Sequence, residues 1–436
     1  AWRCDIRGAA EGKLSGRTVG IKDNIAVAGV PMRCGSKILE HYVPEFDASI
    51  VTRILDAGGH IVGKTAVEDM CMSGSSVTSA DGPVTNPHDV TRIAGGSSCG
   101  SAVLVACGLI DFAIGGDQGG SVRIPASFTG IVGLKPTYGL VPYTGAWAGE
   151  PTVDHLGPMA RTVADCALLL EVIAGYDDGR DPRQFPSTTV PEYSKLFDES
   201  VSGKKVGLLE EGFDSCTEDI VKTIVRDASN KLTEAGMTVT ELSIPLHRDG
   251  SAILEVTSGQ AAYHCLLDGG VGYYAKGFYP VSLLEAMHRG ISAQPHDLHP
   301  LVKFRCLSGE YMTQTYGRSN KFYAKANNLV MELTRQYDAA LHKFDVIVMP
   351  TMPYLATKLP PADCSLADLY QHAESMCDNV MPFNSTGHPA LAINAGFAPT
   401  DDGKQLPVGM MIVGRKFDDV TVLQVARAVE KMTTRD

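Results

Sequence analysis

Two serine clusters, each surrounded by glycine, frame residues 94–125. The first is Gly95-Gly-Ser-Ser-Cys-Gly-Ser and the second is Gly115-Gly-Asp-Gln-Gly-Gly-Ser-Val-Arg-Ile-Pro, with an apolar run at residues 102–114 between them. Glycine lets the backbone approach another group closely. The clusters therefore predict a site where N–H groups converge on a ligand oxygen, either a phosphate cradle or an oxyanion hole. The apolar run predicts a buried spacer that returns both clusters to one site.

Predicted strands and helices alternate along most of the chain. Strands are expected at residues 17–21, 60–64, 204–209, 237–244, 344–349, 382–396 and 406–414, and helices at 47–58, 162–175, 215–236, most of 259–336, and 421–432. This alternation predicts an α/β fold, a single large domain whose mixed central β-sheet is covered by helices on both faces. Ligands of such folds usually bind at the carboxyl ends of the strands.

Three stretches have no clear period. Residues 131–158 are rich in glycine and proline and are expected to be irregular and surface-forming. Residues 177–191 are rich in Pro, Arg and Asp and are expected to form a linker or insertion boundary. Residues 68–79, rich in Ser, Met and Gly, are expected to form a loop that lines a pocket. Asn384-Ser-Thr matches a glycosylation sequon, but its apolar surroundings argue against use of that site.

Composition excludes several classes of function. The 436 residues carry a formal net charge of −12, which argues against nucleic acid as a partner. No uncharged apolar run reaches the roughly 18 residues that a membrane span needs. The 11 cysteines are scattered without a Cys-x-x-Cys pair, which favours a reducing, cytoplasmic compartment and predicts no metal site. No cofactor motif is found.

Three known templates for glycine-rich sites fit the clusters poorly. The P-loop pattern is absent, and the second cluster holds no Gly-x-Gly-x-x-Gly in register. The first cluster matches Gly-x-Ser-x-Gly with Ser98 at its centre, but residues 85–96 are polar and turn-like where a nucleophile elbow needs a strand. All three templates are therefore disfavoured.

The two clusters and the upstream block Ile21-Lys-Asp-Asn together resemble the three catalytic blocks of the amidase signature family. The separations agree, with 75 residues from Lys22 to Ser97 and 24 from Ser97 to Ser121. Pro382-Phe-Asn-Ser-Thr-Gly-His-Pro-Ala and Leu406-Pro-Val-Gly-Met are similar to later segments of the family. The resemblance implies one amidase domain over residues 1–436, with a catalytic core at 15–175, a variable helical pocket region at about 190–340, and remaining core elements at 340–432.

The resemblance also implies a role for each site residue. Ser121 would be the acyl-forming nucleophile, Ser97 the bridging serine on a cis peptide after Gly96, and Lys22 the terminal base. The oxyanion hole would consist of the backbone N–H groups of Gln118, Gly119, Gly120 and Ser121. Supporting roles would fall to Ser98, Asp117 and Arg123, and substrate contacts to Ser73, Gly74, Ser75 and Trp147.

The chemistry fits these residue types. A serine hydroxyl needs a base to take its proton, and an amine is a base only when it is uncharged. Spacing alone would favour a solvated strand end for Lys22, and a plain ion pair for Asp117 with Arg123. The chain departs from the common family pattern at Cys99, where glycine is usual, and at Gln118, where many members have Thr or Ile. Gln118 makes the chain look closest to stand-alone amidases of nitrile degradation.

The expected activity is hydrolysis of a carboxamide to a carboxylic acid and ammonia or an amine. The expected partner is a small-molecule amide, without cofactor, nucleic acid or membrane, and a homodimer is left open. Three alternatives remain: a carbamate or anilide hydrolase of the urethanase or aryl acylamidase type with the same triad, the glutaminase subunit of a tRNA-dependent amidotransferase, and a non-catalytic interaction module. The last is disfavoured because all three triad residues are present.

Overall fold

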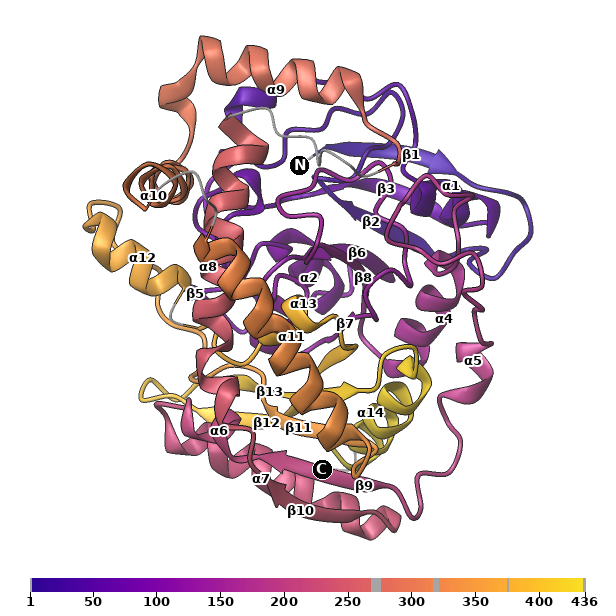
Figure 1. The fold of residues 1–436 in the computed structure, drawn as a ribbon. Helices are drawn as coiled ribbons and strands as arrows, with labels where there is room; N and C mark the ends of the chain where they lie inside the picture. The colour runs from indigo at the N-terminus through magenta and orange to yellow at the C-terminus, as the bar shows by residue number, and fades with distance from the viewer. Residues whose placement is uncertain (1, 268–275, 317–320, 375, 434–436) are drawn as a thin grey trace.

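The structure, a computed structural model, is organised around one mixed β-sheet (Figure 1) and describes residues 2–267, 276–316, 321–374 and 376–433. Among these residues the sheet has eleven strands. In spatial order they are β1 Arg3–Arg7, β3 His60–Thr65, β2 Thr18–Lys22, β6 Phe112–Asp117, β8 His155–Ala160, β7 Val132–Lys135, β12 Ala390–Pro399, β13 Gln405–Gly414, β11 Val346–Pro350, β9 Lys205–Leu209 and β10 Thr238–Leu242. The predicted fold class is confirmed.

The sheet combines parallel and antiparallel pairs. β2 runs parallel to both β3 and β6, and β9 runs parallel to both β10 and β11. The strands between these two groups pair antiparallel. Because β2, β3 and β6 are parallel, their carboxyl ends meet at one edge of the sheet, which is where side chains of the site are expected.

Helices cover both faces of the sheet. One face packs against α1 Ser49–Asp56, α4 Val163–Ile173, α7 Asp219–Lys231 and α14 Asp419–Thr433. The other packs against α2 Cys99–Ala106, α3 Arg123–Thr129, α8 Gly250–Ala262, α11 Lys321–Leu341 and α13 Pro382–Thr386. Farther from the sheet lie α9 Val281–Ala293, α10 Pro300–Thr315 and α12 Leu366–Glu374, and the short helices α5 Tyr193–Leu196 and α6 Glu210–Asp214 join the strands. In Figure 1, α11 crosses in front of the strands.

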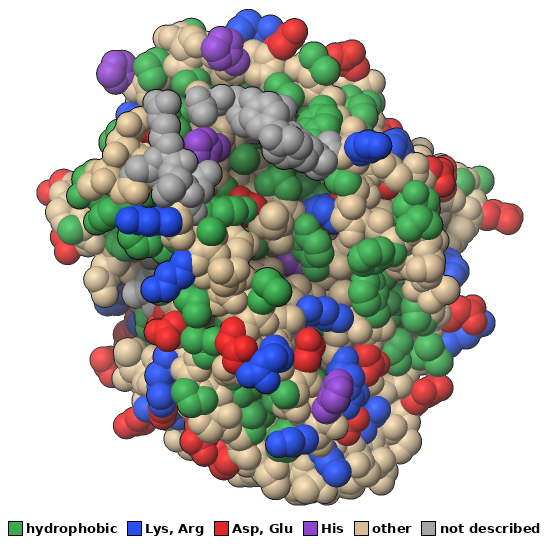
Figure 2. Space-filling view, in the orientation of Figure 1, with side chains coloured by type: hydrophobic (Ala, Val, Ile, Leu, Met, Phe, Trp, Pro, Cys, Tyr) green, Lys and Arg blue, Asp and Glu red, His purple; other side chains and the backbone are tan. Residues whose placement is uncertain are grey.

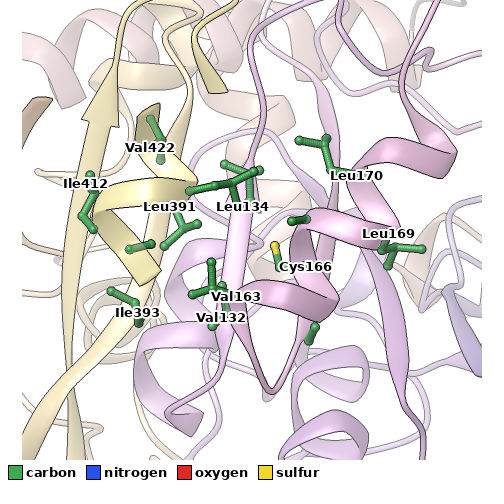
Figure 3. Close-up of a cluster of buried hydrophobic side chains, with 14 of the residues drawn as sticks. Val132, Leu134, Val163, Cys166, Leu169, Leu170, Leu391, Ile393, Ile412 and Val422 are labelled. Carbon is green, nitrogen blue, oxygen red and sulfur yellow. The ribbon is translucent and has the colours of Figure 1, made fainter. Parts of the chain in front are cut away.

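The alternation of side chains along the central strands explains why two helical layers form. On β13, Met410 and Ile412 enter one apolar cluster while Met411 and Val413 enter the cluster on the opposite face. Successive side chains of a strand point to opposite faces, so a strand that is apolar throughout must be covered twice. Figure 3 shows one of these layers, where α4 and α14 cover β7, β12 and β13.

The apolar run at residues 102–114 forms two elements rather than one. It continues α2, turns at Gly108, where φ is +68°, and enters β6. The helix begins directly after Ser98, and the strand ends at Asp117 just before the second cluster. The run therefore folds back on itself, as the sequence predicted for a spacer that returns both clusters to one place.

Two expectations were wrong. Residues 131–158 are not surface-forming: they contain β7 and β8 at the centre of the sheet, and Trp147 between them is buried. These strands are short and separated by loop sequence, so glycine and proline obscured them. In residues 382–396, the first part is α13 instead of strand, because Pro382 occupies the first helical position, which proline tolerates.

Other segments follow the sequence more closely. The helix expected at residues 162–175 is α4, which Thr162 caps by accepting a hydrogen bond from the Asp165 N–H. Residues 85–96 contain a small second sheet of β4 Thr85–Asn86 and β5 Asp89–Ile93, where the sequence indicated turns. Residues 177–191 lack regular structure, but Asp177 and Asp181 in this segment are buried, so part of it is anchored in the protein.

The surface and the helices bear on possible partners. Among the described residues, no helix combines the length and apolarity that crossing a bilayer would require. Figure 2 shows basic and acidic side chains interspersed over the lower half of one face, without a continuous basic patch there. The division of the domain at about residues 190 and 340 stays a prediction.

Candidate active site

The fold brings the two serine clusters into direct contact. The Ser98 N–H donates to the Ser121 carbonyl oxygen at 3.2 Å. The Ser98 hydroxyl donates to the Gly116 carbonyl oxygen and accepts from the Gly116 N–H, both at 3.2 Å. Ser98 therefore connects the start of α2 to the end of β6. The peptide bond between Gly96 and Ser97 is cis, as the resemblance implied.

Lys22 lies at the carboxyl end of β2, beside β6, and is fully buried. Its Nζ donates to the Ser97 Oγ at 2.8 Å and to the Gly116 carbonyl oxygen at 2.9 Å. The solvent-facing alternative for this lysine is therefore wrong. The parallel pairing of β2 and β6 explains its position, because it places the end of β2 next to the segment that leads into the second serine cluster.

A buried ion pair holds the loop of the second cluster. The Asp117 carboxylate accepts hydrogen bonds from the Gly120 N–H at 2.8 Å and the Val122 N–H at 3.1 Å. Arg123 donates to both carboxylate oxygens, at 2.9 and 3.0 Å. Burial alone would raise the pKa of this carboxyl, but the charge and hydrogen bonds of Arg123 outweigh burial and hold the pKa far below its usual value. Asp117 is therefore a carboxylate that holds the backbone at Gly120 and Val122, on either side of Ser121.

Gly120 meets a steric requirement in this loop. Its φ is +120°, and a Cβ there would lie 2.5 Å from a methyl carbon of Val380. A side chain at this position would displace the loop that carries Ser121.

Asn384 of α13 completes this network, and sequence reasoning missed it. Its Nδ2 donates to the Asp117 Oδ1 at 2.8 Å and to the Asp117 carbonyl oxygen at 2.9 Å. Its Oδ1 accepts from Arg123 at 2.7 Å. The apolar surroundings of Asn384 correctly indicated burial, but only the packing of α13 against the loop shows its partners.

A cavity of about 80 Å³ opens beside Ser121. Most of its wall is apolar, contributed by Met70, Met72, Ile124, Trp147, Val153, Leu254, Ala262 and Met381. Polar groups on the wall include Ser73, Gln118, Glu150, Ser258 and Arg305. Ser73, Gly74 and Trp147, which were predicted to contact substrate, line this cavity.

Ser75 lies behind this wall. It is fully buried, and its hydroxyl donates to the Glu68 Oε1 at 3.1 Å. Its place in the structure therefore points to support of the pocket loop rather than to direct contact with a ligand.

Gln118 lines the cavity and is hydrogen-bonded to the segment that carries Trp147. Its Nε2 donates to the Tyr143 hydroxyl at 2.7 Å, and that hydroxyl donates to the Trp147 carbonyl oxygen at 2.9 Å. The departure at Gln118 thus links the second serine cluster to the loop that carries Trp147.

Besides Cys377, which lines the cavity, two cysteines lie close to the site. The Cys99 Sγ donates to the Ala66 carbonyl oxygen at 3.5 Å, and burial raises the pKa of its thiol to about 12. Cys71, in the segment at residues 68–79 that was expected to line a pocket, lines the cavity. Burial raises the pKa of the Cys71 thiol to about 11, although the charge of Lys22 opposes the shift. Both side chains are therefore neutral thiols near neutral pH.

The side chains that the structure describes form no metal site. Over the described ranges, no group of three or more His, Cys, Asp or Glu side chains is arranged to hold a metal ion.

Comparison with known protein families shows to which family the chain belongs. The model of the family described as Amidase matches residues 2–423. The chain belongs to the amidase family. It is accordingly a hydrolase acting on amide C–N bonds.

Relatives of this amidase include proteins of two kinds. It is 47% identical to an enantioselective amidase of Rhodococcus rhodochrous, over 95% of this chain and 79% of the relative. It is 40% identical to a subunit of the glutamyl-tRNA(Gln) amidotransferase of Methanosarcina mazei, over 97% of this chain and 86% of the relative. The crystal structure of the corresponding subunit from Thermotoga maritima superimposes with a TM-score of 0.81 at 31% identity, covering 99% of this chain and 87% of that one.

Replacing Asn384 tests the buried network of this amidase. Asn384→Ala leaves donors and acceptors of Asp117 and Arg123 unpaired in a buried site, so we expect the free energy of unfolding to fall by about 2–3 kcal/mol. Urea denaturation followed by circular dichroism measures the change. Ser385→Ala is the matched control, because the Ser385 Oγ is buried without a hydrogen-bond partner. Equal effects of the two substitutions would contradict the role assigned to Asn384.

Proposed function

We propose that this amidase hydrolyses carboxamides with an apolar acyl group through an acyl-enzyme on Ser121, with Ser97 as proton relay and Lys22 as base. One observation supports the roles above all: a fully buried Lys22 Nζ lies 2.8 Å from the Ser97 Oγ, and the cluster of Ser97 is hydrogen-bonded to Ser121. A buried lysine that contacts a serine beside a cavity is suited to move protons rather than to solvate a surface.

The proposed reaction begins with attack of the Ser121 oxygen on the amide carbon. When Lys22 is uncharged, its lone pair can accept the Ser97 proton across the same 2.8 Å separation, while Ser97 takes the proton of Ser121. The tetrahedral intermediate then collapses, the C–N bond breaks, and ammonia or an amine leaves with the proton returned by the relay. Water next attacks the acyl-enzyme with the same relay acting as base, which releases the carboxylic acid and restores Ser121.

The backbone N–H groups of Gln118, Gly119, Gly120 and Ser121 are proposed to stabilise the oxyanion. Asp117 supports this assignment because it fixes the loop before substrate binds, through the Gly120 N–H and Arg123. Donors that are already in place stabilise charge without reorganisation, and loss of one typically costs about 3–4 kcal/mol.

The substrate class is inferred from the cavity. Its mostly apolar wall suits an aliphatic or aromatic acyl group. The same triad would also cleave an anilide or a carbamate that fits this cavity. We further propose that the enzyme acts on a small-molecule amide in the cytoplasm without a partner subunit, which its similarity to an enantioselective amidase supports.

A glutaminase subunit is the second candidate. Relatives named as amidotransferase subunits support it, and so does the presence of both Arg305 and Glu150 on the cavity wall. A cation and a carboxyl group in one cavity are what an α-amino acid such as glutamine would require.

A panel of amides separates these substrate classes. We expect kcat/KM for benzamide and 2-phenylpropionamide to exceed that for glutamine at least about tenfold, because burial of a phenyl group contributes about 2 kcal/mol. Anilides and carbamates of the same acids complete the panel, with ammonia or amine release as the readout. A preference for glutamine would favour the glutaminase alternative and contradict the apolar acyl class.

Replacing Ser121 tests the nucleophile. Ser121→Ala should abolish amide hydrolysis and leave the circular dichroism spectrum unchanged, since no other hydroxyl is proposed to form the acyl-enzyme. Ser229→Ala is the control, because Ser229 is a buried serine of α7 whose hydroxyl donates to the Val225 carbonyl oxygen. Substantial residual turnover by Ser121→Ala would rule out the assignment.

Replacing Lys22 tests the base. Lys22→Ala should lower kcat/KM by at least about a hundredfold near pH 7, the usual contribution of a positioned general base, with a smaller loss at high pH where hydroxide is available. The pH–rate profile is the measurement. Lys64→Met serves as control, because Lys64 is also buried but pairs with Asp23 at 3.0 Å. An unchanged profile in Lys22→Ala would mean that this lysine is not the base.

A further inference from the structure

A second cavity, of about 720 Å³, shares Trp147 as a wall residue with the cavity beside Ser121. Its walls come from four parts of the chain: the segment between β7 and β8, residues 180–183, Cys265 after α8, and residues 276–287, which lead into and include the first half of α9 at the top of Figure 1. The volume lies within the range of about 300–1,000 Å³ that is typical of small-molecule sites. The proposed reaction does not use this cavity.

Aromatic side chains make up much of its interior. Tyr138, Tyr143, Trp147, Phe278 and Tyr279 all line it, together with the aliphatic side chains of Leu283, Leu284 and Met287. Flat, rigid rings of this kind bind apolar or aromatic bodies at low cost in conformational entropy. Phe278 is itself anchored, because its ring packs edge-on against Phe46 and its N–H donates to the Arg180 carbonyl oxygen at 2.8 Å.

A buried ion pair builds the wall nearest to Tyr143. Arg183 donates to the two Asp181 carboxylate oxygens at 2.5 and 2.8 Å, and its guanidinium lies 4.8 Å from the centre of the Tyr143 ring. Asp181 also accepts from the Tyr143 N–H at 2.8 Å. The charges of Arg183 and Asp181 thus offset each other, and the pair holds the aromatic wall in place.

The other charged residues that the structure describes on the cavity wall are positive. Arg180 and Lys276 line it and are exposed, and among the described lining residues Asp181 is the only acid. With Asp181 paired to Arg183, Arg180 and Lys276 give the described part of the wall a net positive charge beside the aromatic side chains. Such a wall favours an anion whose body is apolar.

We propose that this cavity is a second ligand site, and that it binds a carboxylate with an aromatic body. The carboxylate would lie at the rim near Arg180 and Lys276, and the ring would pack among Trp147, Phe278 and Tyr143. Trp147 would separate this ligand from the substrate. Hydrolysis of an arylalkyl amide would release an acid of this class, but the inference stands on the cavity and holds whichever amide the enzyme cleaves.

Fluorescence of Trp147 provides a direct binding assay. The chain has two tryptophans, Trp2 and Trp147, so a Trp2→Phe variant retains Trp147 as its single tryptophan. Titration with 4-bromophenylacetate, whose bromine quenches a tryptophan it contacts, should give saturable quenching. The assay uses no amide substrate, so its outcome is separate from that of the proposed hydrolysis.

Variants in the same background locate the bound acid. Arg180→Gln combined with Lys276→Gln should raise the Kd about threefold to tenfold, as expected for two partly exposed ion pairs. Ala148→Phe, which adds a ring to the wall of the second cavity, should weaken binding independently of charge. Arg289→Gln is the matched control and should leave the Kd unchanged, because Arg289 is exposed on α9 and pairs with Glu285.

Two results would overturn the proposal. The first is absence of saturable quenching in the Trp2→Phe protein. The second is quenching whose Kd is the same in the charge variant, in Ala148→Phe and in the control, since the acid would then bind only in the cavity beside Ser121.

Discussion

The buried contact between Asp117 and Arg123 determines the shape of the loop on which the candidate site depends. Both side chains are fully inaccessible to solvent, and together they contact the backbone of the loop, α13 and the segment before it. Removal of one partner of such a pair typically costs about 3–5 kcal/mol, because the other charge stays buried. The pair is satisfied here because Asn384 and two backbone N–H groups complete the coordination of the carboxylate. The loop that bears Ser121 is thereby fixed by contacts between segments that are far apart in the sequence.

Most of the fold could be predicted from local patterns. The helix expected at residues 162–175 agrees within two residues at each end with α4 Val163–Ile173. β11 and β13 were found because they are apolar throughout and must be buried on both faces. In contrast, β7 and β8 were missed because their sequences are short and contain glycine and proline, and it is the neighbouring strands that hold them in the sheet. Tertiary contacts therefore decided what local propensity did not indicate.

The candidate site, like the fold, could be predicted only in part from the sequence. The family resemblance singled out Lys22, Ser97 and Ser121, because the glycine-flanked serines follow the lysine at the expected separations. The fold brings this lysine and the two clusters together. Nothing local to Lys22 indicates that it is buried, because its environment is made by β6 and by the segment before α2. Asn384 and Tyr143 were missed for that reason. Each meets the site through a contact between segments far apart in the sequence, and such contacts leave no periodic signal.

Residues 99–117 fold back on themselves, and this arrangement indicates where the segment between the clusters can change in length within the family. α2 and β6 meet the site at one end, and the turn that joins them, at residues 107–109, lies at the other end and is exposed. Length and composition can drift at that turn while the two serine clusters keep their separation in space. A residue inserted next to Ser98 or Asp117 would instead rotate or shift a cluster relative to its partner. The number of residues between the clusters can therefore change at the turn, but not next to Ser98 or Asp117.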